Sequence, residues 1–269
     1  MADVLVIGVV VGYLSSVAQW SGVFKREIQD IVFGKKFIGD RKDIESLWDN
    51  VTKQLIKNRF ADIHDPLLSA IRKNAIPSDE SISYYEDHDS DITLKWIDRD
   101  NGIIKSIEAI TFTLVAESDK KITLPLKTFT LMSKDANVQV SAPNILVDGK
   151  TPEIKHNEPS KNGNEIHHSS IVFLEGKKQY CVSYTREKTY CIYNDYFIGL
   201  KSQYLLKDLT VTLNLPDGVE ATFIERGTNI GFTDVKKTKD CIKKKLKGVI
   251  FPKQGYIFAL IVVQPPKQP

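Results

Sequence analysis

The chain has 269 residues, of which 26% are charged and 42% are hydrophobic, and these proportions exclude a disordered or a collagen-like protein. The net charge of +3 is too small to indicate a nucleic-acid-binding protein by itself. The cysteines are few and widely spaced and predict neither a disulfide framework nor a zinc site: Cys181, Cys191 and Cys241.

Residues 4–24 form the first predicted element, an uncharged run rich in valine and glycine. A helix over this run is about 30 Å long, the thickness of the hydrocarbon core of a bilayer. Lys25 and Arg26 follow the run, and basic residues stay on the cytoplasmic side, so the pattern favours a transmembrane helix over a signal sequence or a buried core helix. We therefore predict a transmembrane helix over residues 1–24, single-pass in the inner (cytoplasmic) membrane, with the N-terminus outside and the C-terminal domain cytoplasmic.

Small and polar residues form one stripe of this predicted helix, at spacings of four, three, four and three: Gly8, Gly12, Ser15, Gln19 and Gly22. Membrane helices pack through such residues because small side chains allow close approach and polar ones bond across the contact. The stripe predicts a homo-oligomer, in which Gln19 and the serines line a polar path. A monomeric anchor is the alternative.

Two helices are predicted next. Asp40 is a candidate N-cap, and apolar residues at helical spacing predict an amphipathic helix over 41–60. Asp65 and Pro66 predict the start of a second helix, which ends near residue 74. Residues 25–78 are thus expected to form an amphipathic helical stalk.

From residue 79 to residue 269 the hydrophobic period changes to two. Apolar and polar residues alternate over 110–114 and 209–215, and turn residues occur at 100–102. A long polar loop is expected over 148–169. The predicted fold class is α+β and membrane-anchored, with one N-terminal transmembrane helix, a short helical stalk and an antiparallel β-sandwich or barrel-like C-terminal domain.

A lysine cluster is the first candidate binding feature, with Val235, Ile242 and Leu246 at roughly helical spacing. Such a basic helix face would bind a phosphate-rich ligand or the anionic lipids of the inner leaflet, and a merely solvated face is the alternative. The predicted ligand-binding lysines are Lys236, Lys237, Lys239, Lys243, Lys244 and Lys245.

Tyrosines interleaved with basic residues are the second candidate. Six of the ten tyrosines lie between Tyr180 and Tyr204. Aromatic rings beside cations can stack on bases, so Tyr180, Tyr184 and Tyr190 are predicted to stack on a ligand, with Arg186 on its phosphate. Cross-strand packing is the alternative.

Catalytic motifs are absent from the sequence, which predicts neither an enzyme nor a cofactor. Residues 86–91 resemble half of a calcium loop, but Ile92 stands where glycine is required, so no metal site is expected. A hydrolase that uses His167 or His168 as a general base is a further alternative.

The layout of the whole chain, with the stripe from Gly8 to Gly22 and the lysines from Lys236 to Lys247, resembles the membrane effectors of bacterial nucleotide-signalling anti-phage defence systems, of cyclic-oligonucleotide, type III CRISPR and Hailong types. The resemblance implies a homo-oligomeric ion channel or membrane-disrupting pore. A nucleotide or short oligonucleotide bound to the cytosolic β domain would gate it. The alternative is a membrane-tethered adaptor whose β-sandwich binds a protein partner without transport.

Overall fold

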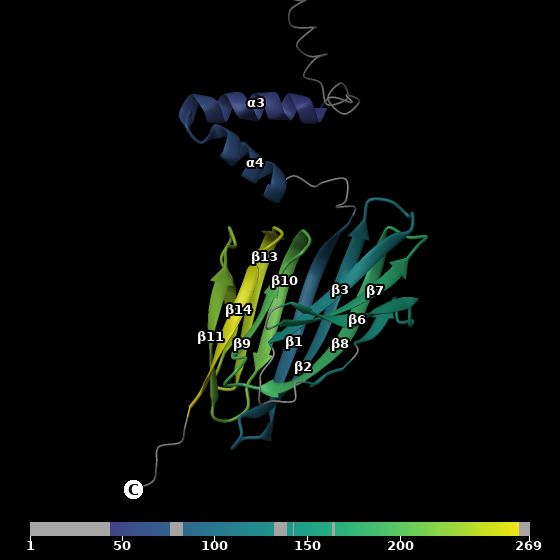
Figure 1. Ribbon diagram of the computed structural model, residues 1–269, viewed down its shortest axis with the longest axis vertical. Helices are drawn as coiled ribbons and strands as arrows, with labels where there is room; N and C mark the ends of the chain where they lie inside the picture. The colour runs from purple at the N-terminus through teal and green to yellow at the C-terminus, as the bar shows by residue number, and fades with distance from the viewer. Residues whose placement is uncertain (1–43, 76–82, 132–138, 142, 163–164, 264–269) are drawn as a thin grey trace, which may run out of the picture. The chain divides into compact units, whose positions relative to one another are not determined.

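The computed structural model describes residues 44–75, 83–131, 139–141, 143–162 and 165–263 (Figure 1). The chain divides into two compact units between Lys73 and Asn74, and each is described by itself. The predicted transmembrane helix lies outside the described residues, and so does its stripe: Gly8, Gly12, Ser15, Gln19 and Gly22.

Two helices make up the described part of the first unit, α3 (Ile44–Arg59) and α4 (His64–Ala75). Basic side chains lie in the last turn of α3, where they interact favourably with the carbonyl end of the helix. Asp65 lies in the first turn of α4, and Pro66 is tolerated there because its missing N–H would have no helical partner. The helix predicted over 65–74 is confirmed, and the one predicted over 41–60 is confirmed from Ile44 to Arg59, while its candidate cap Asp40 lies outside the described residues.

The predicted α+β fold class is wrong. The helices α3 and α4 have 16 and 12 residues and carry several charges, and no helix in the described ranges is long and apolar enough to cross a membrane. The architecture is mainly β, because almost all of the second unit is built from strands. This corrects the α+β membrane-anchored fold class, and the described ranges hold no helix that supports a single-pass location in the inner membrane. The homo-oligomeric channel stays a prediction.

A large eight-stranded sheet forms the body of the second unit, with the order β12-β13-β10-β1-β2-β8-β4 and β5 also paired with β8. Its strands are β1 (Ser83–Asp98), β2 (Ile103–Ala116), β4 (Gln139–Val140), β5 (Asn144–Val147), β8 (Gln179–Cys191), β10 (Leu206–Asn214), β12 (Thr233–Lys237) and β13 (Cys241–Ile250). The strands predicted over 110–114 and 209–215 lie in β2 and β10. The sequence predicted an antiparallel arrangement, but β1 and β10 pair in parallel. The large sheet is therefore mixed.

Two three-stranded sheets accompany the large one. The first is β11 (Val219–Arg226), β14 (Gly255–Val262) and β9 (Phe197–Lys201), and the second is β3 (Ile122–Leu131), β7 (Glu165–Leu174) and β6 (Ile154–Asn162). They lie at the left and the right of Figure 1. The loop predicted over 148–169 is wrong, because β6 and the start of β7 occupy most of it.

One face of the large sheet packs against both small sheets and makes two hydrophobic cores. Leu209 and Leu213 of β10 pack with Phe258 of β14 in the first core, and all three are fully buried. Phe112 of β2 packs with Val172 of β7 in the second. Burying each such side chain contributes about 1.5–3 kcal/mol, so these two cores fix the small sheets on the large one.

The turn between β1 and β2 follows the sequence prediction. Gly102 has a φ of 66°, a left-handed conformation that glycine adopts without strain. A Cβ atom at this position would lie 2.3 Å from the ring of Tyr193, so the close approach also requires glycine. The Asp98 carboxylate accepts hydrogen bonds from the backbone and side chain of Asn101 and closes the turn.

Candidate anion-binding site

A cavity of about 260 Å³ lies between the sheet of β3, β7 and β6 and the part of the large sheet formed by β8 and β4. Twelve residues line it, and among them are Arg186, Lys127, His156 and His168. None of the twelve is an aspartate or a glutamate. The lining side chains that the structure describes are therefore positive or neutral, with the Glu108 carboxylate behind Arg186, and this favours a negatively charged ligand.

The histidines reach the cavity because of strand alternation. His156 of β6 lies opposite Ser170 of β7, and His168 stands two residues before Ser170, so the three share one face of their sheet. The fully buried Val172 shows that this face points to the core. The His156 Nδ1 atom and the Ser170 hydroxyl form a hydrogen bond of 2.9 Å, which orients the imidazole at the wall.

Arg186 enters the cavity from β8 on the other side. Its Nε donates a short hydrogen bond to Oε2 of Glu108, which lies directly opposite on β2. The other oxygen, Oε1, accepts a hydrogen bond of 2.8 Å from the Ser90 hydroxyl. Both carboxylate oxygens are thus engaged, and the buried Glu108 holds the base of the guanidinium in place.

Protonation states follow from this arrangement. Burial lowers the pKa of Arg186, but the adjacent Glu108 carboxylate raises it by more. The pKa therefore lies above its ordinary value, and the guanidinium stays charged. Burial raises the pKa of Tyr184 to about 12, so its phenol stays neutral. Burial, and then the neighbouring His167, lower the pKa of His168. A bound anion would act in the opposite direction and favour the protonated imidazole.

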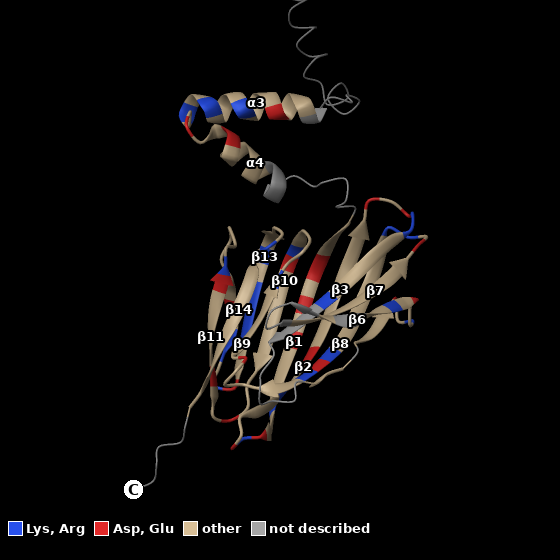
Figure 2. Ribbon diagram, in the orientation of Figure 1, with Lys and Arg blue, Asp and Glu red and all other residues tan. Residues whose placement is uncertain are grey.

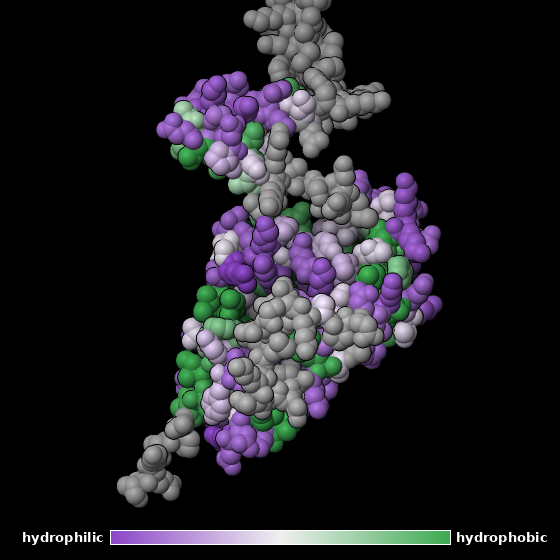
Figure 3. Space-filling view, viewed as in Figure 1, coloured by the Kyte–Doolittle hydropathy of each residue, from purple (hydrophilic) through white to green (hydrophobic). Residues whose placement is uncertain are grey.

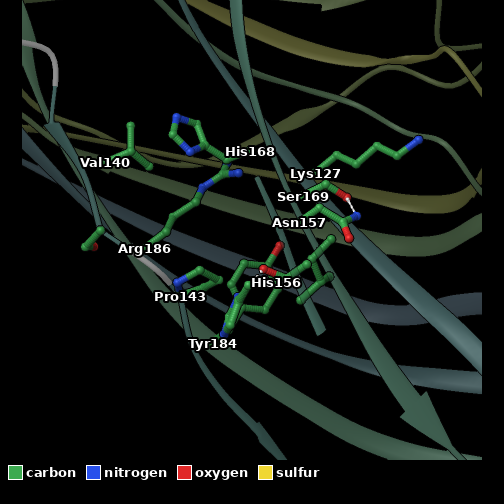
Figure 4. A pocket seen from close by; sticks show the side chains of 12 residues that line it. Lys127, Val140, Pro143, His156, Asn157, His168, Ser169, Tyr184 and Arg186 are labelled. Carbon is green, nitrogen blue, oxygen red and sulfur yellow. Dashed lines mark hydrogen bonds between the residues drawn. The ribbon is translucent and has the colours of Figure 1, made fainter. Parts of the chain in front are cut away.

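Figure 4 shows how the lining side chains lie. The Arg186 side chain points toward His168, while Lys127 extends toward the opposite side of the view, near Asn157 and Ser169. The Asn157 amide and the Ser169 hydroxyl are 3.5 Å apart. Nitrogen donors of Arg186 and His168 thus lie together at one side of the cavity, and the Lys127 ammonium lies apart from them.

The predicted lysine helix is wrong, because residues 236–247 lie in β12, a turn and β13. Lys243 and Lys245 lie on one face of β13, and Lys244 lies on the other. Lys244 pairs with Asp234 at 2.6 Å and stands 5.0 Å from the centre of the Phe223 ring, so its side chain is only 15% exposed.

The other predicted lysines do not form one continuous basic surface with those of β13. Lys236 and Lys237 belong to the edge strand β12, and Lys239, in the turn, lies 3.6 Å from the carboxylate of Asp217. The lysines of β13 lie beside β10, and the acidic residues of β1 lie on the other side of β10 (Figure 2). Positive and negative charges thus share this face.

The predicted tyrosines have different environments. Tyr180 and Tyr190 are buried in the cores, at 4% and 2% exposure, and cannot stack on a ligand. Tyr184 and Arg186 both line the cavity. Three strands, β10, β1 and β2, separate β8 from β13, so the structure does not bring the tyrosines and the lysines together.

Three groups at the site were not assigned to ligand binding from the sequence: His156, Ser170 and Glu108. His156 falls in the segment expected to be a loop and Ser170 directly follows that segment, and recognising the period-two pattern of β6 and β7 would have placed them on one face. Within the residues that the structure describes, no group of three or more His, Cys, Asp or Glu side chains is arranged to hold a metal ion.

Comparison with protein-family models gives no match, and comparison with curated proteins gives none either. Among solved structures, the chain is similar to a Legionella pneumophila protein assigned to nutrient binding, with 11% identity, a TM-score of 0.43 and coverage of 69% of each chain. It is also similar to yeast LTA4 hydrolase, with 12% identity, a TM-score of 0.41 and coverage of 74% of this chain and 32% of that one. A Parabacteroides distasonis protein assigned as a protease gives 14% identity, a TM-score of 0.40 and coverage of 67% and 40%.

These similarities carry no functional argument, because the TM-scores lie below 0.5. The chain also spans only about a third to two fifths of the length of the hydrolase and the protease-like protein. The functional assignment therefore rests on the cavity.

Proposed function

We propose that this protein binds a small anionic ligand, a carboxylate or a phosphate ester, in the cavity between β8 and the sheet of β3, β7 and β6. The observation that carries the proposal is the Glu108-anchored Arg186 among described lining residues of which none is acidic. A guanidinium presents a planar fork of donors that matches carboxylate and phosphate oxygens. His168, His156 and Ser170 supply further donors from the opposite wall.

The size of the cavity limits the ligand. Pockets for drug-sized ligands have volumes of about 300–1,000 Å³, and this cavity, at about 260 Å³, lies just below that range. A small metabolite fits this volume, whereas an oligonucleotide is too large to enter it. The proposal thus keeps the anionic ligand expected from the sequence, but places it at Arg186 instead of the lysine cluster.

Binding is measured by isothermal titration of the full chain at constant ionic strength, with inorganic phosphate, glycerol phosphate and succinate as probes and glycerol as the neutral reference. We expect saturable binding of at least one anion and none of glycerol. A preference for succinate over the phosphates, or the reverse, identifies the headgroup. If no anion binds more tightly than glycerol, the proposal is wrong.

The double variant His156→Leu with His168→Leu should weaken anion binding by at least about 100-fold, because it removes two hydrogen bonds to a charged group, each worth roughly 1.5–3 kcal/mol. It leaves the Glu108–Arg186 pair intact. The matched control is Lys243→Gln with Lys245→Gln, which removes two cations from the far face of the large sheet. Equal weakening in both double variants would show that the anion responds only to net charge.

A further inference from the structure

The sheet of β11, β14 and β9 has an apolar outer face. Its inner face holds the buried Tyr256 and Phe258, so by alternation the neighbouring residues point outward. Among these, Ile224, Ile261 and Phe197 are 45%, 55% and 46% exposed. Such residues on a solvent-facing side are unusual, because sheets with one face in the core are normally polar on the other.

Strand register makes these residues contiguous. Ile224 of β11 lies opposite Ile257 of β14, and Phe197 of β9 lies opposite Ala259 of β14. Figure 3 shows hydrophobic residues gathered along the side of the domain where these strands lie. Contiguous exposed apolar patches mark interaction sites more often than isolated ones do.

Opposite charges stand at the two ends of this face. Glu220, at the start of β11, lies opposite Ile261, and Arg226, at the end of β11, lies opposite Gly255, which in turn pairs with Lys201. All three charged residues are exposed. The face is therefore negative at one end, apolar in the middle and positive at the other end.

We propose that a second copy of this chain covers the outer face of β11, β14 and β9 in a two-fold symmetric dimer. A two-fold axis between the sheets, perpendicular to the strands, lays β11 antiparallel on the same strand of the second copy. It brings Glu220 to the partner's Arg226, and Arg226 to the partner's Glu220. A face with one charge sign at each end is self-complementary under this axis, and this complementarity is the reason for choosing a copy of the chain as the occupant.

The dimensions predict a weak dimer. Three strands about 4.8 Å apart, up to eight residues long at about 3.4 Å each, cover roughly 400 Å². Stable interfaces bury about 800 Å² on each partner, so association is expected to depend on concentration.

Sedimentation equilibrium of the full chain tests the proposal. Wild-type protein should dimerise as its concentration rises, and Glu220→Arg or Arg226→Glu alone should weaken the dimer about tenfold, because each puts two like-charged pairs in the interface. An equal mixture of the two variants should form a mixed dimer at least as well as wild type, because both ion pairs are then restored. Ile224→Lys should abolish dimerisation, and circular dichroism of these exposed-site variants checks that they remain folded.

A wild-type chain that stays monomeric, or a dimer that persists in Ile224→Lys, overturns the assignment of this surface. Weakening by both charge variants without restoration in the mixture overturns the two-fold arrangement. The dimer surface is built from β11, β14 and β9, and the cavity is lined by other strands, so anion binding by the variants is expected to be unchanged.

Discussion

The variant Arg186→Leu should lower the free energy of unfolding by about 3–5 kcal/mol, because it leaves the Glu108 carboxylate buried without its counter-charge. The Glu108 side chain is only 11% exposed, and one of its oxygens would keep Ser90 as its donor while the other loses Arg186. Urea unfolding at neutral pH, followed by circular dichroism, measures the loss.

The control for this prediction is the double variant Glu108→Leu with Arg186→Leu. Removing both charges replaces a buried ion pair by apolar packing, which is often neutral or stabilising. We expect the double variant to be more stable than Arg186→Leu alone. If the losses of Glu108→Leu and Arg186→Leu simply add, the two residues are not coupled and Glu108 does not position the guanidinium.

Acid should destabilise the second unit through His88. This residue is 5% exposed, its ring stacks on Phe112, and its Nδ1 has no hydrogen-bond partner in the part of the chain that the structure describes. Burial lowers the pKa of His88 from 6.5 to about 4, while Glu108 raises it and Arg186 lowers it by smaller amounts. Between these two pH values the unfolded chain binds a proton at His88 that the folded chain does not bind.

Stability from His88 is therefore complete above about pH 6.5 and falls as the pH drops toward 4. From pH 7.5 to pH 4.5 the loss at this residue should be about 2–3 kcal/mol. The free energy of unfolding is measured for wild type and His88→Leu at several pH values across this range. Between pH 7.5 and pH 4.5 it should fall by about 2–3 kcal/mol more in wild type than in His88→Leu. His64→Gln is the control, since this histidine lies in the first unit, and an unchanged slope in His88→Leu would contradict the assignment.

Local patterns predicted the elements where one physical signal was dominant. The period of α3, the first turn of α4, and the alternation over 209–215 each had a single interpretation. The segment 236–247 had two, because Ile242 and Leu246 fit a helix as well as a strand. Lys244 stands between them on the same core-facing side, and only its pairing with Asp234 and the Phe223 ring makes a strand with an inward lysine stable.

The site depends on contacts that local sequence cannot show. Arg186 and Glu108 are 78 positions apart, and their pairing follows from the register of β2 and β8. His156 and His168 become neighbours only when β6 and β7 pair. The sequence therefore pointed to Arg186 and Tyr184, which line the cavity, but associated them with lysines that lie on distant strands.

The most direct test of anion binding in the cavity is a nuclear magnetic resonance titration of the five histidine rings, at 64, 88, 156, 167 and 168, with inorganic phosphate and with succinate at constant pH and ionic strength. Individual His→Gln variants assign the resonances. The account predicts saturable shifts at His156 and His168, with the signals of His64 and buried His88 changing little. Shifts of equal size at all five rings, or none at His156 and His168, would contradict it.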